Sequence, residues 1–529
     1  MSEKHSITRA TGILGAATLL SRITGLLRDV VIGRMFGAGF ATDAFFMAFT
    51  LPNLLRRFFA EGSLTAAFVP TYSELYHREG RDEAIRVGNI CFTLLFVVMA
   101  VVVLLGVLAS PWLVRAIGYG FGDTQGKLLL TDLLNRIMFP YLFFVSLLAL
   151  LTGSLNVLGH YFLPALSPVM LNLAMVACAV FLSPFFHPPI LALALGVLLG
   201  GALQLLMQWP ILRRYGIVPH PDFHWRHPAV RRIARLMLPG LVGVAIYQIN
   251  VVVGRLLASF LEEGSVSYLY YGQRLFEFPQ GVFIVSLAQA VLPAMSRQAA
   301  AGDAAGLKDS LDFSLRLIAV ATLPAALGLM LCALPIFSLF FLSAAFDYEA
   351  VRQTALALIA YAPGLFFLGI ARVIVPTFYA LQDTRTPVWI SFWTLLLNAG
   401  LGVLLMQFFG HVGLALALTL ATFGNCLLLI WALRRKLGRL GLRGLAGCCL
   451  RLVPPLLVMA AVVVPLLGLA DWRSMGTSAA FHKAGVLMLA VGAGALVYGW
   501  GSLLCGVREV RDGWNLVRRK LTRRGRHAS

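Results

Sequence analysis

Charged residues are scarce in this chain, and acidic ones are the scarcest. Only 12% of the 529 residues are charged, with 23 Asp and Glu against 43 Lys and Arg, whereas 59% are hydrophobic. A soluble protein carries about 25% charged residues, so a soluble globular protein is excluded and a polytopic helical membrane protein is indicated. The first residues, MSEKHSITRATGILG, lack a small-residue cleavage site. We therefore expect a first transmembrane helix here rather than a removed signal peptide.

The common catalytic and metal-binding motifs are also missing. The segment GDTQGK at Gly122–Lys127 has the wrong spacing for a phosphate loop and no following Ser or Thr, which argues against ATP hydrolysis. No DxD, HExxH or GxSxG occurs, and none of the seven cysteines forms a CxxC pair. His220, His224 and His227 have helical spacing that suggests a metal site, but three neighbouring prolines disfavour a helix. We predict a solvated loop there.

Apolar runs of about 20 residues, the length that crosses a bilayer, predict about fourteen spans. They lie near 10–36, 41–70, 88–118, 130–156, 161–184, 189–212, 235–260, 266–295, 311–341, 350–380, 387–409, 412–433, 447–470 and 483–506. An even number places both termini on one side. If that side is the cytoplasm, it holds roughly 28 Lys and Arg against about 5 on the other face, as the positive-inside rule requires. The basic tail VRRKLTRRGR then anchors at anionic lipid head groups rather than nucleic acid.

Two pairs of similar segments indicate an internal repeat. VVIGRMF at 30–36 resembles VVVGRLL at 251–257, and Ser167-Pro168-Val169 resembles Thr386-Pro387-Val388 at nearly the same offset. Six spans precede the second copy, so the copies are parallel repeats, an arrangement that places a substrate site between the halves. The predicted fold is an all-α polytopic membrane protein with two pseudo-symmetric six-helix lobes and two further C-terminal helices. Its parts are 1–212 (first lobe), 213–234 (basic cytoplasmic linker), 235–436 (second lobe), 437–507 (last two spans) and 508–529 (basic tail).

Arginines lie in the middle of the first span. LLSRITGLLRDVVIG carries Arg22, Arg28 and Asp29. An arginine at the bilayer centre costs roughly 2.5–3.5 kcal/mol on insertion scales, so it is rare unless it faces a watery, protein-lined cavity. Ser21 and Arg28 share one side of a straight helix, and Arg22 and Asp29 share another. Gly25 between them would permit a bend that brings both sides inward.

The second span carries a further polar face, in and before FMAFTLPNLLRRFFAEGSL. At about 100° per residue, Asp43, Asn53, Arg57 and Glu61 fall within about 80°, and Arg56 lies about 60° beyond the edge. Such a face on an apolar helix is expected where it lines a cavity.

The eighth span, YLYYGQRLFEFPQG, adds a third group. Tyr270, Arg274 and Glu277 share a face by their spacing. Pro279 and Gly281 then interrupt the helix, and irregular backbone at membrane depth is tolerated only where protein or a watery cavity satisfies it. Together, the three spans predict a cationic intramembrane cavity with an anionic occupant. Arginine binds phosphate oxygens bidentately and keeps its charge, so a phosphate-bearing occupant is favoured.

A structural interpretation of these charges stays open. Arg28–Asp29 and Arg274–Glu277 would then be internal ion pairs that hold helices together, and Arg34 and Arg255 would reach toward the membrane interface. Structural roles are also open for Arg57, Arg136, Arg316 and Arg372.

The chain resembles the MurJ (MviN) lipid II flippases of the multidrug/oligosaccharidyl-lipid/polysaccharide (MOP) exporter superfamily. The similarity is most specific in SRITGLLRD, FGAGFATDAFFMAFTLPNLLRRFFAEGSLTAAFVP and YYGQRLFEFPQGV. The resemblance implies a transporter rather than an enzyme. Such a transporter moves lipid II, the undecaprenyl-diphosphate-linked peptidoglycan precursor, from the cytoplasmic to the periplasmic leaflet of the bacterial inner membrane by alternating access. The last two spans would hold the lipid tail.

Residue by residue, the resemblance implies that Arg22, Arg28, Arg56 and Arg274 bind the substrate. The family's acidic partners match Asp29, Asp43 and Glu61. From the spans themselves we expect further supporting cavity residues, namely Ser21, Asn53, Arg57, Gln273 and Glu277. No catalytic residue and no metal ligand is implied. Some relatives have Asp where this chain has Gln273.

The resemblance also implies no cofactor and no ATP, with membrane potential as the energy source and the coupling cation left open. Part of the family binds sodium through acidic residues in spans seven and eleven, where this chain offers only the neutral Asn250 and Asn398. The implied partners are lipid II and membrane lipids, with the peptidoglycan synthesis machinery as a candidate and nucleic acid excluded.

Two other functions stay open from the residues. A flippase for another polyprenyl-diphosphate-linked oligosaccharide would bind the diphosphate in a similar way. An ion-coupled drug antiporter of the same superfamily would favour cationic substrates and therefore an acidic cavity, whereas this one is basic.

Overall fold

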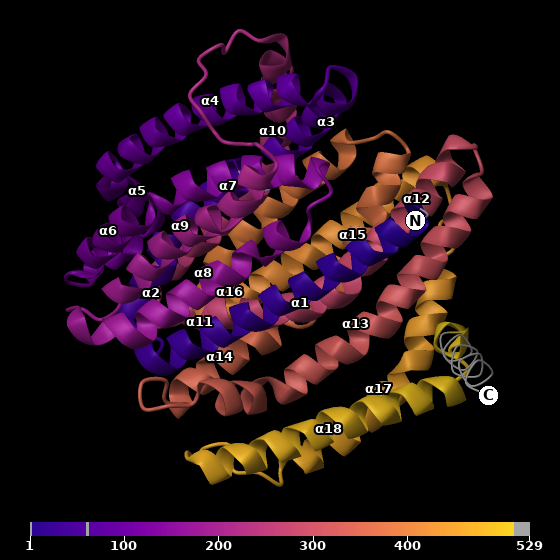
Figure 1. The fold of residues 1–529 in the computed structure, drawn as a ribbon. Coiled ribbons are helices and arrows are strands. Elements are labelled where there is room, and N and C mark those ends of the chain that lie inside the picture. The colour runs from indigo at the N-terminus through magenta and orange to yellow at the C-terminus, as the bar shows by residue number, and fades with distance from the viewer. Residues whose placement is uncertain (1–2, 60–62, 513–529) are drawn as a thin grey trace, which may run out of the picture. The chain divides into compact units, whose positions relative to one another are not determined.

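The computed structural model describes residues 3–59 and 63–512, and every regular element in these ranges is a helix (Figure 1). The predicted all-α fold is therefore confirmed. Ten helical segments in these ranges are long and apolar enough to cross a membrane. Each of the fourteen predicted spans falls on one or more helices, but the count of fourteen stays a prediction. Contacts divide the chain into two units, Met1–Ser267 and Tyr268–Ser529.

The first unit holds ten α-helices and two short 3₁₀ turns. They are α1 (Glu3–Phe36), α2 (Phe40–Phe59), α3 (Ser63–Arg78), α4 (Arg81–Leu108), α5 (Ser110–Ile117), η1 (Tyr119–Asp123), α6 (Lys127–Met138), α7 (Tyr141–Val157), α8 (Phe162–Leu182), η2 (Ser183–Phe185), α9 (Leu191–Arg214) and α10 (Pro228–Ser259). Helix α8 packs against both α1 and α9, and α2 packs against α6.

Gly37 and Gly126 have φ of 72° and 81° in the turns before α2 and α6, a conformation in which glycine has no Cβ penalty.

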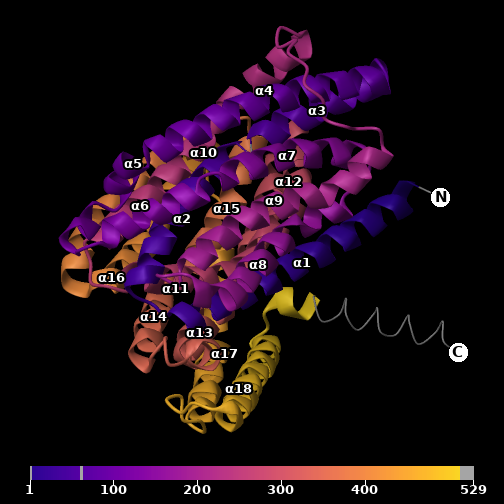
Figure 2. The ribbon, with the colours of Figure 1, turned by 60° about the vertical axis from the view of Figure 1, so that its left-hand side comes forward.

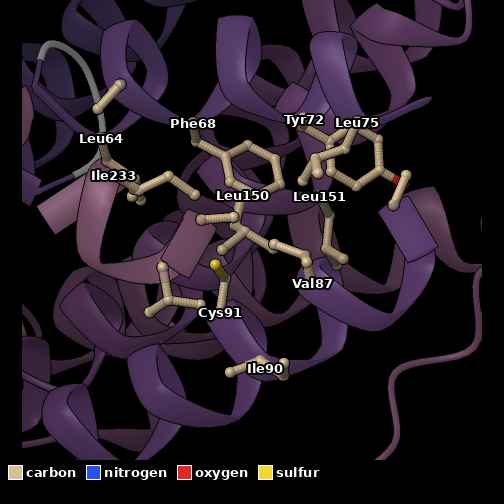
Figure 3. Packing of buried hydrophobic residues seen from close by; sticks show 14 of the residues in the cluster. Leu64, Phe68, Tyr72, Leu75, Val87, Ile90, Cys91, Leu150, Leu151 and Ile233 are labelled. Carbon is tan, nitrogen blue, oxygen red and sulfur yellow. The ribbon is translucent and has the colours of Figure 1, made fainter. Parts of the chain in front are cut away.

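A hydrophobic core joins α3, α4, α7 and α10 (Figure 3). Its members include Phe68, Tyr72, Val87, Ile90, Leu150, Leu151 and Ile233, all buried. Helix α10 thus packs within the first unit, and it begins at Pro228, inside the linker predicted at 213–234. The two units are defined by contacts alone and do not test an internal repeat. The predicted lobes 1–212 and 235–436 and their repeat relation therefore stay predictions.

The second unit contains the later helices. They are most of α11 (Ser265–Pro279), the π-helix η3 (Gln280–Ile284), α12 (Val285–Ala300), α13 (Ala304–Phe341), α14 (Tyr348–Tyr361), α15 (Gly364–Ala380), α16 (Arg385–Leu437), α17 (Arg443–Leu467) and α18 (Thr477–Leu504). Helices α17 and α18 pack on each other and along α13 (Figure 2).

Helix α16 is two helical legs joined at a glycine. A straight helix of 53 residues would measure about 80 Å. However, Lys436 near its end lies 2.6 Å from Asp383, which precedes its start. Gly410, with φ 55° and ψ −132°, is the non-helical residue at which the chain turns back. The predicted separate spans 387–409 and 412–433 correspond to these two legs.

Candidate functional site

Helix α1 presents the first group of predicted site residues. It is helical from Glu3 to Phe36, through Gly25. Arg28 and Asp29 are adjacent in the chain, and their side chains contact each other. The Arg28 Nη2 and Nε donate to Asp29 Oδ1 at 2.6 and 3.0 Å. Arg28 is 6% exposed and Asp29 is 0% exposed, so this is a buried ion pair, as the structural interpretation expected, whereas Ser21 and Arg22 are half-buried.

Helix α8 supplies a partner that the sequence did not point to. Arg28 Nη1 donates to Asn172 Oδ1 at 3.1 Å and approaches Met175 Sδ at 3.9 Å. Asn172 Nδ2 in turn donates to Thr24 Oγ1 at 3.2 Å. Asn172 lies among mostly apolar residues of its span, and only the packing of α8 on α1 shows its role.

Asp43 in the first turn of α2 accepts several hydrogen bonds. Lys127 Nζ lies 2.9 Å from Asp43 Oδ2, which also accepts from the Gly264 N–H at 2.8 Å. Asp43 Oδ1 accepts from the backbone N–H and the hydroxyl of Ser267 at 2.9 and 2.7 Å. Lys127 Nζ also lies 4.2 Å from the centroid of the Phe121 ring. Because Asp43 and Lys127 are both buried, this cluster joins α2, α6 and the start of α11 in a water-poor setting.

The remaining predicted residues of the second span lie near the end of α2. Asn53, Arg56 and Arg57 are half-buried, and Arg56 Nε donates to Asn53 Oδ1 at 3.2 Å. The two residues are one helical turn apart, which brings their side chains onto the same face. Glu61 lies outside the described residues.

In the second unit, the predicted group on α11 does come together. Arg274 Nη1 lies 3.3 Å from Glu277 Oε2, and Gln273 Nε2 donates to Glu277 Oε1 at 3.5 Å. The Arg274 side chain is 39% exposed, whereas Arg28 and Asp29 are buried. The α-helix ends at Pro279 and continues as the π-helix Gln280–Ile284, which confirms the predicted interruption. Proline lacks the N–H of a regular turn, and π-helical turns often mark functional sites.

Some other arginines have clear structural partners. Arg136 Nε pairs with Asp132 at 2.9 Å one turn away. Arg316 lies between Asp312 at 3.2 Å and Glu509 at 3.1 Å, which ties α13 to the segment after α18. These contacts agree with the structural interpretation of Arg136 and Arg316. Arg255 Nη1 donates to the Val266 carbonyl at 3.3 Å, and Arg372 is exposed.

The three linker histidines bind three different groups. His220 Nδ1 lies 2.9 Å from Asn89 Nδ2, and His227 Nε2 lies 3.1 Å from Glu83 Oε1. The hydrogen bond from His224 holds the pKa of Asp222 below its usual range. The chain is not helical at 217–224, as the prolines predict. In the part of the chain that the structure describes, no group of three His, Cys, Asp or Glu side chains could hold a metal ion.

Comparisons with known proteins bear on this arrangement. A family model described as "Lipid II flippase MurJ" matches residues 32–478. A curated protein of Vibrio cholerae named "Probable lipid II flippase MurJ" is 38% identical over 513 residues, which cover 94% of this chain and 95% of that protein. The "Lipid II flippase MurJ" of Burkholderia cenocepacia is 37% identical over 435 residues, covering 82% and 84% of the two chains.

Solved structures agree with these sequence matches. The structure titled "Lipid II flippase MurJ, inward closed conformation" superposes with a TM-score of 0.76 at 27% identity, covering 94% of this chain and 99% of that one. An inward-facing multidrug resistance transporter of the MATE family and MOP superfamily superposes with a TM-score of 0.66 at 14% identity, covering 81% and 98%. The second likeness concerns the fold alone.

Proposed function

The chain belongs to the MurJ family of lipid II flippases, and on that premise we propose that it moves lipid II from the cytoplasmic to the periplasmic leaflet by alternating access. It is a multi-pass membrane transporter and not an enzyme. At the site, the proposal rests on the arginines that lie within apolar helices. Arg28 is buried in α1, and Arg22 and Arg56 are half-buried nearby in the sequence.

We propose that Arg22, Arg28, Arg56 and Arg274 bind the diphosphate of the substrate. A guanidinium group is a planar donor that matches phosphate oxygens and stays charged when water is excluded. Arg274 supports this role because its side chain is 39% exposed, which leaves the guanidinium accessible to an anion beside Glu277. Ser21, Asn53, Arg57 and Gln273 would supply further polar contacts. Asp29, Glu277 and Glu61 would balance the charge of the empty site.

Energy would come from the membrane potential. One charge that crosses the full potential gains about 2.3 kcal/mol per 100 mV, so a few arginines that cross part of the field would bias the return of the empty transporter. No phosphate loop motif for ATP occurs in the sequence. The acidic pattern of a family sodium site is also missing from spans seven and eleven, which favours potential over sodium.

We further propose the bacterial inner membrane as the location, with both termini in the cytoplasm. The basic linker, the loop around 434–443 and the tail after Arg508 then lie on one side, as the positive-inside rule requires. Partners would be lipid II, membrane lipids and the peptidoglycan synthesis machinery.

Replacement of the arginines tests the site. With Arg28→Ala or Arg274→Ala as the sole copy, we expect loss of growth although the folded protein still accumulates in the membrane. Because Arg28→Ala leaves Asp29 buried without this partner, Arg28→Ala with Asp29→Asn serves as a second variant without that buried charge. Arg136→Ala is the control, since its side chain is 44% exposed and pairs with Asp132; it should grow normally. Normal growth of both the Arg28 and Arg274 variants would overturn the proposed site.

A further inference from the structure

We infer that Asn172 of α8 is a positioning residue that fixes the guanidinium of Arg28 for the substrate diphosphate. This inference rests on the proposed function of Arg28. Arg28 sits on α1, and Asn172 reaches it from a helix 144 positions away in sequence. Asn172 is only 5% exposed, so its amide is removed from bulk water and its hydrogen bonds are made with protein groups.

One face of α1 and one of α8 meet at this amide. Ser21, Thr24 and Arg28 follow i, i+3, i+7 spacing, which places them on the same face of a helix. Asn172 Nδ2 lies 3.2 Å from Thr24 Oγ1 and 3.4 Å from the Ser21 carbonyl oxygen. On the other side, Asn172 Oδ1 accepts from Arg28 Nη1 at 3.1 Å. The amide therefore spans two turns of α1 with both of its ends bonded.

The direction of the amide is determined by its neighbours. The Thr24 hydroxyl donates its one proton to backbone carbonyls, those of Leu20 at 3.0 Å and Ser21 at 3.1 Å. With its proton used in this way, the Thr24 hydroxyl oxygen can only accept a hydrogen bond from Asn172. The NH₂ group of the Asn172 amide must therefore face Thr24. Arg28 has donors and no acceptor, so the amide oxygen must face Arg28. Both ends require the same orientation, and a flipped amide would break both contacts.

The neutrality of this partner matters for an anion site. Asn172 carries no charge, and neither do Thr24 and Ser21, which it contacts, nor Met175, which Arg28 approaches. Asp29 supplies one negative charge against the guanidinium. A second carboxylate in place of Asn172 would overcompensate the cation and repel a diphosphate. An amide holds Nη1 in place without cancelling its charge, which is the property that a preorganised anion site needs.

The first experiment measures the affinity of the full-length protein for lipid II in nanodiscs of neutral lipid. We expect Asn172→Ala to bind roughly tenfold more weakly, the effect of removing one hydrogen bond to a charged group. Gln204→Ala is the matched control. Gln204 is also a buried amide against α8, but it donates to the Ser167 carbonyl at 2.8 Å, away from Arg28 in the sequence of α8 contacts. It should bind lipid II like the wild type even if it melts at a lower temperature.

The second experiment uses Asn172→Asp, which separates positioning from simple packing. The carboxylate keeps an acceptor for Arg28 but places an oxygen against the Thr24 and Ser21 oxygens and adds a charge. At pH 8 we expect affinity at least about tenfold below that of the wild type. When protonated, the carboxylic acid offers a carbonyl acceptor to Arg28 and one O–H donor toward Thr24, and so restores most of the amide's hydrogen bonds without a charge. At each pH, the affinity of Asn172→Asp is divided by that of the wild type at the same pH. This ratio should return toward one as the pH falls.

The outcomes separate this inference from the proposed function. If Arg28→Ala weakens lipid II binding while Asn172→Ala and Asn172→Asp bind like the wild type at every pH, Asn172 is merely structural and the inference fails alone. If Arg28→Ala with Asp29→Asn binds lipid II as tightly as the wild type, the proposed role of Arg28 fails and the inference fails with it. A pH-dependent recovery that is seen with Asn172→Asp and not with Gln204→Glu supports the positioning role.

Discussion

Buried charges in this protein are held by specific partners rather than left to the membrane. Asp43 is the clearest example, because Lys127, Gly264 and Ser267 all donate to it. Removing one partner of a buried ion pair leaves an uncompensated charge, which costs far more than the pair itself contributes. The Asp43 cluster should therefore govern the stability of the contact between α2 and α6.

Lys127→Met tests this directly. We expect it to destabilise the protein by about 3–5 kcal/mol, because Asp43 loses its cation in a buried site. Adding Asp43→Asn should recover part of the loss, since no buried charge then remains. The measurement is thermal unfolding of the purified protein in detergent. Arg136→Met, which breaks an exposed pair worth at most about 1 kcal/mol, is the control. A Lys127→Met variant that melts with the wild type would contradict the argument.

At the residue scale, the sequence identifies important charged residues more readily than it identifies their contact partners. The cost of a charge in a bilayer points to Arg28 and Asp29 without any structure. Asn172 and Lys127 give no such signal. Asn172 is an ordinary polar residue until α8 packs on α1, and Lys127 lies just outside the span predicted at 130–156. Both roles depend on contacts between helices distant in sequence, which periodicity does not report.

At the element scale, α16 depends on a single backbone conformation. Gly410 has φ 55° and ψ −132°, a region that is open to glycine and strained for other residues. The salt bridge between Asp383 and Lys436 closes the two legs at their far ends. The hydrogen bond from Lys436 holds the pKa of Asp383 well below its usual range. This bridge therefore stabilises the hairpin above the ordinary carboxyl pKa and is lost only in strong acid.

Gly410→Ala should destabilise the protein by about 1–3 kcal/mol, because alanine is strained at this φ and ψ. Gly400→Ala is the matched control on the same element, where an added Cβ meets nothing within 4 Å. It should be neutral or slightly stabilising, since alanine is the better helix former. Thermal melting of the two variants side by side gives the comparison. Equal melting temperatures would mean that the turn does not depend on glycine.

Element boundaries follow from the sequence where proline and glycine stand in apolar runs. The break after Pro279 and the two legs of α16 are examples. The π-helical form of Gln280–Ile284 was not predicted from the sequence; in the structure this segment packs against α13 and α15.

At the scale of the whole molecule, a further match supports the predicted repeat. Arg213 stacks on Trp209 at the end of α9, with 5.3 Å to the ring centroid, and Arg435 stacks on Trp431 at the end of α16, with 3.9 Å. Tryptophan and arginine are four residues apart in both places, and the offset along the chain is close to that of the two earlier matches. Aromatic and basic residues together are typical of a cytoplasmic membrane interface.

The predicted topology can be checked with fusions. A fluorescent protein fused after Ser529 should fluoresce, because it folds in the cytoplasm. Alkaline phosphatase inserted in the loop between α17 and α18, at residues 470–476, should be active, because it needs the periplasm. An active phosphatase at the C-terminus together with an inactive one in the loop would reverse the orientation and remove the basis for a cytoplasmic entry of the substrate.

The central claim is that this chain carries lipid II across the membrane. The most direct measurement depletes the protein from its cells and quantifies the lipid II that an impermeant enzyme can cleave from the outer leaflet. If the chain carries lipid II, the outer pool disappears on depletion while lipid II remains inside. The wild-type chain should restore the outer pool, and Arg274→Ala should not. An outer pool that is unchanged after depletion would contradict the claim.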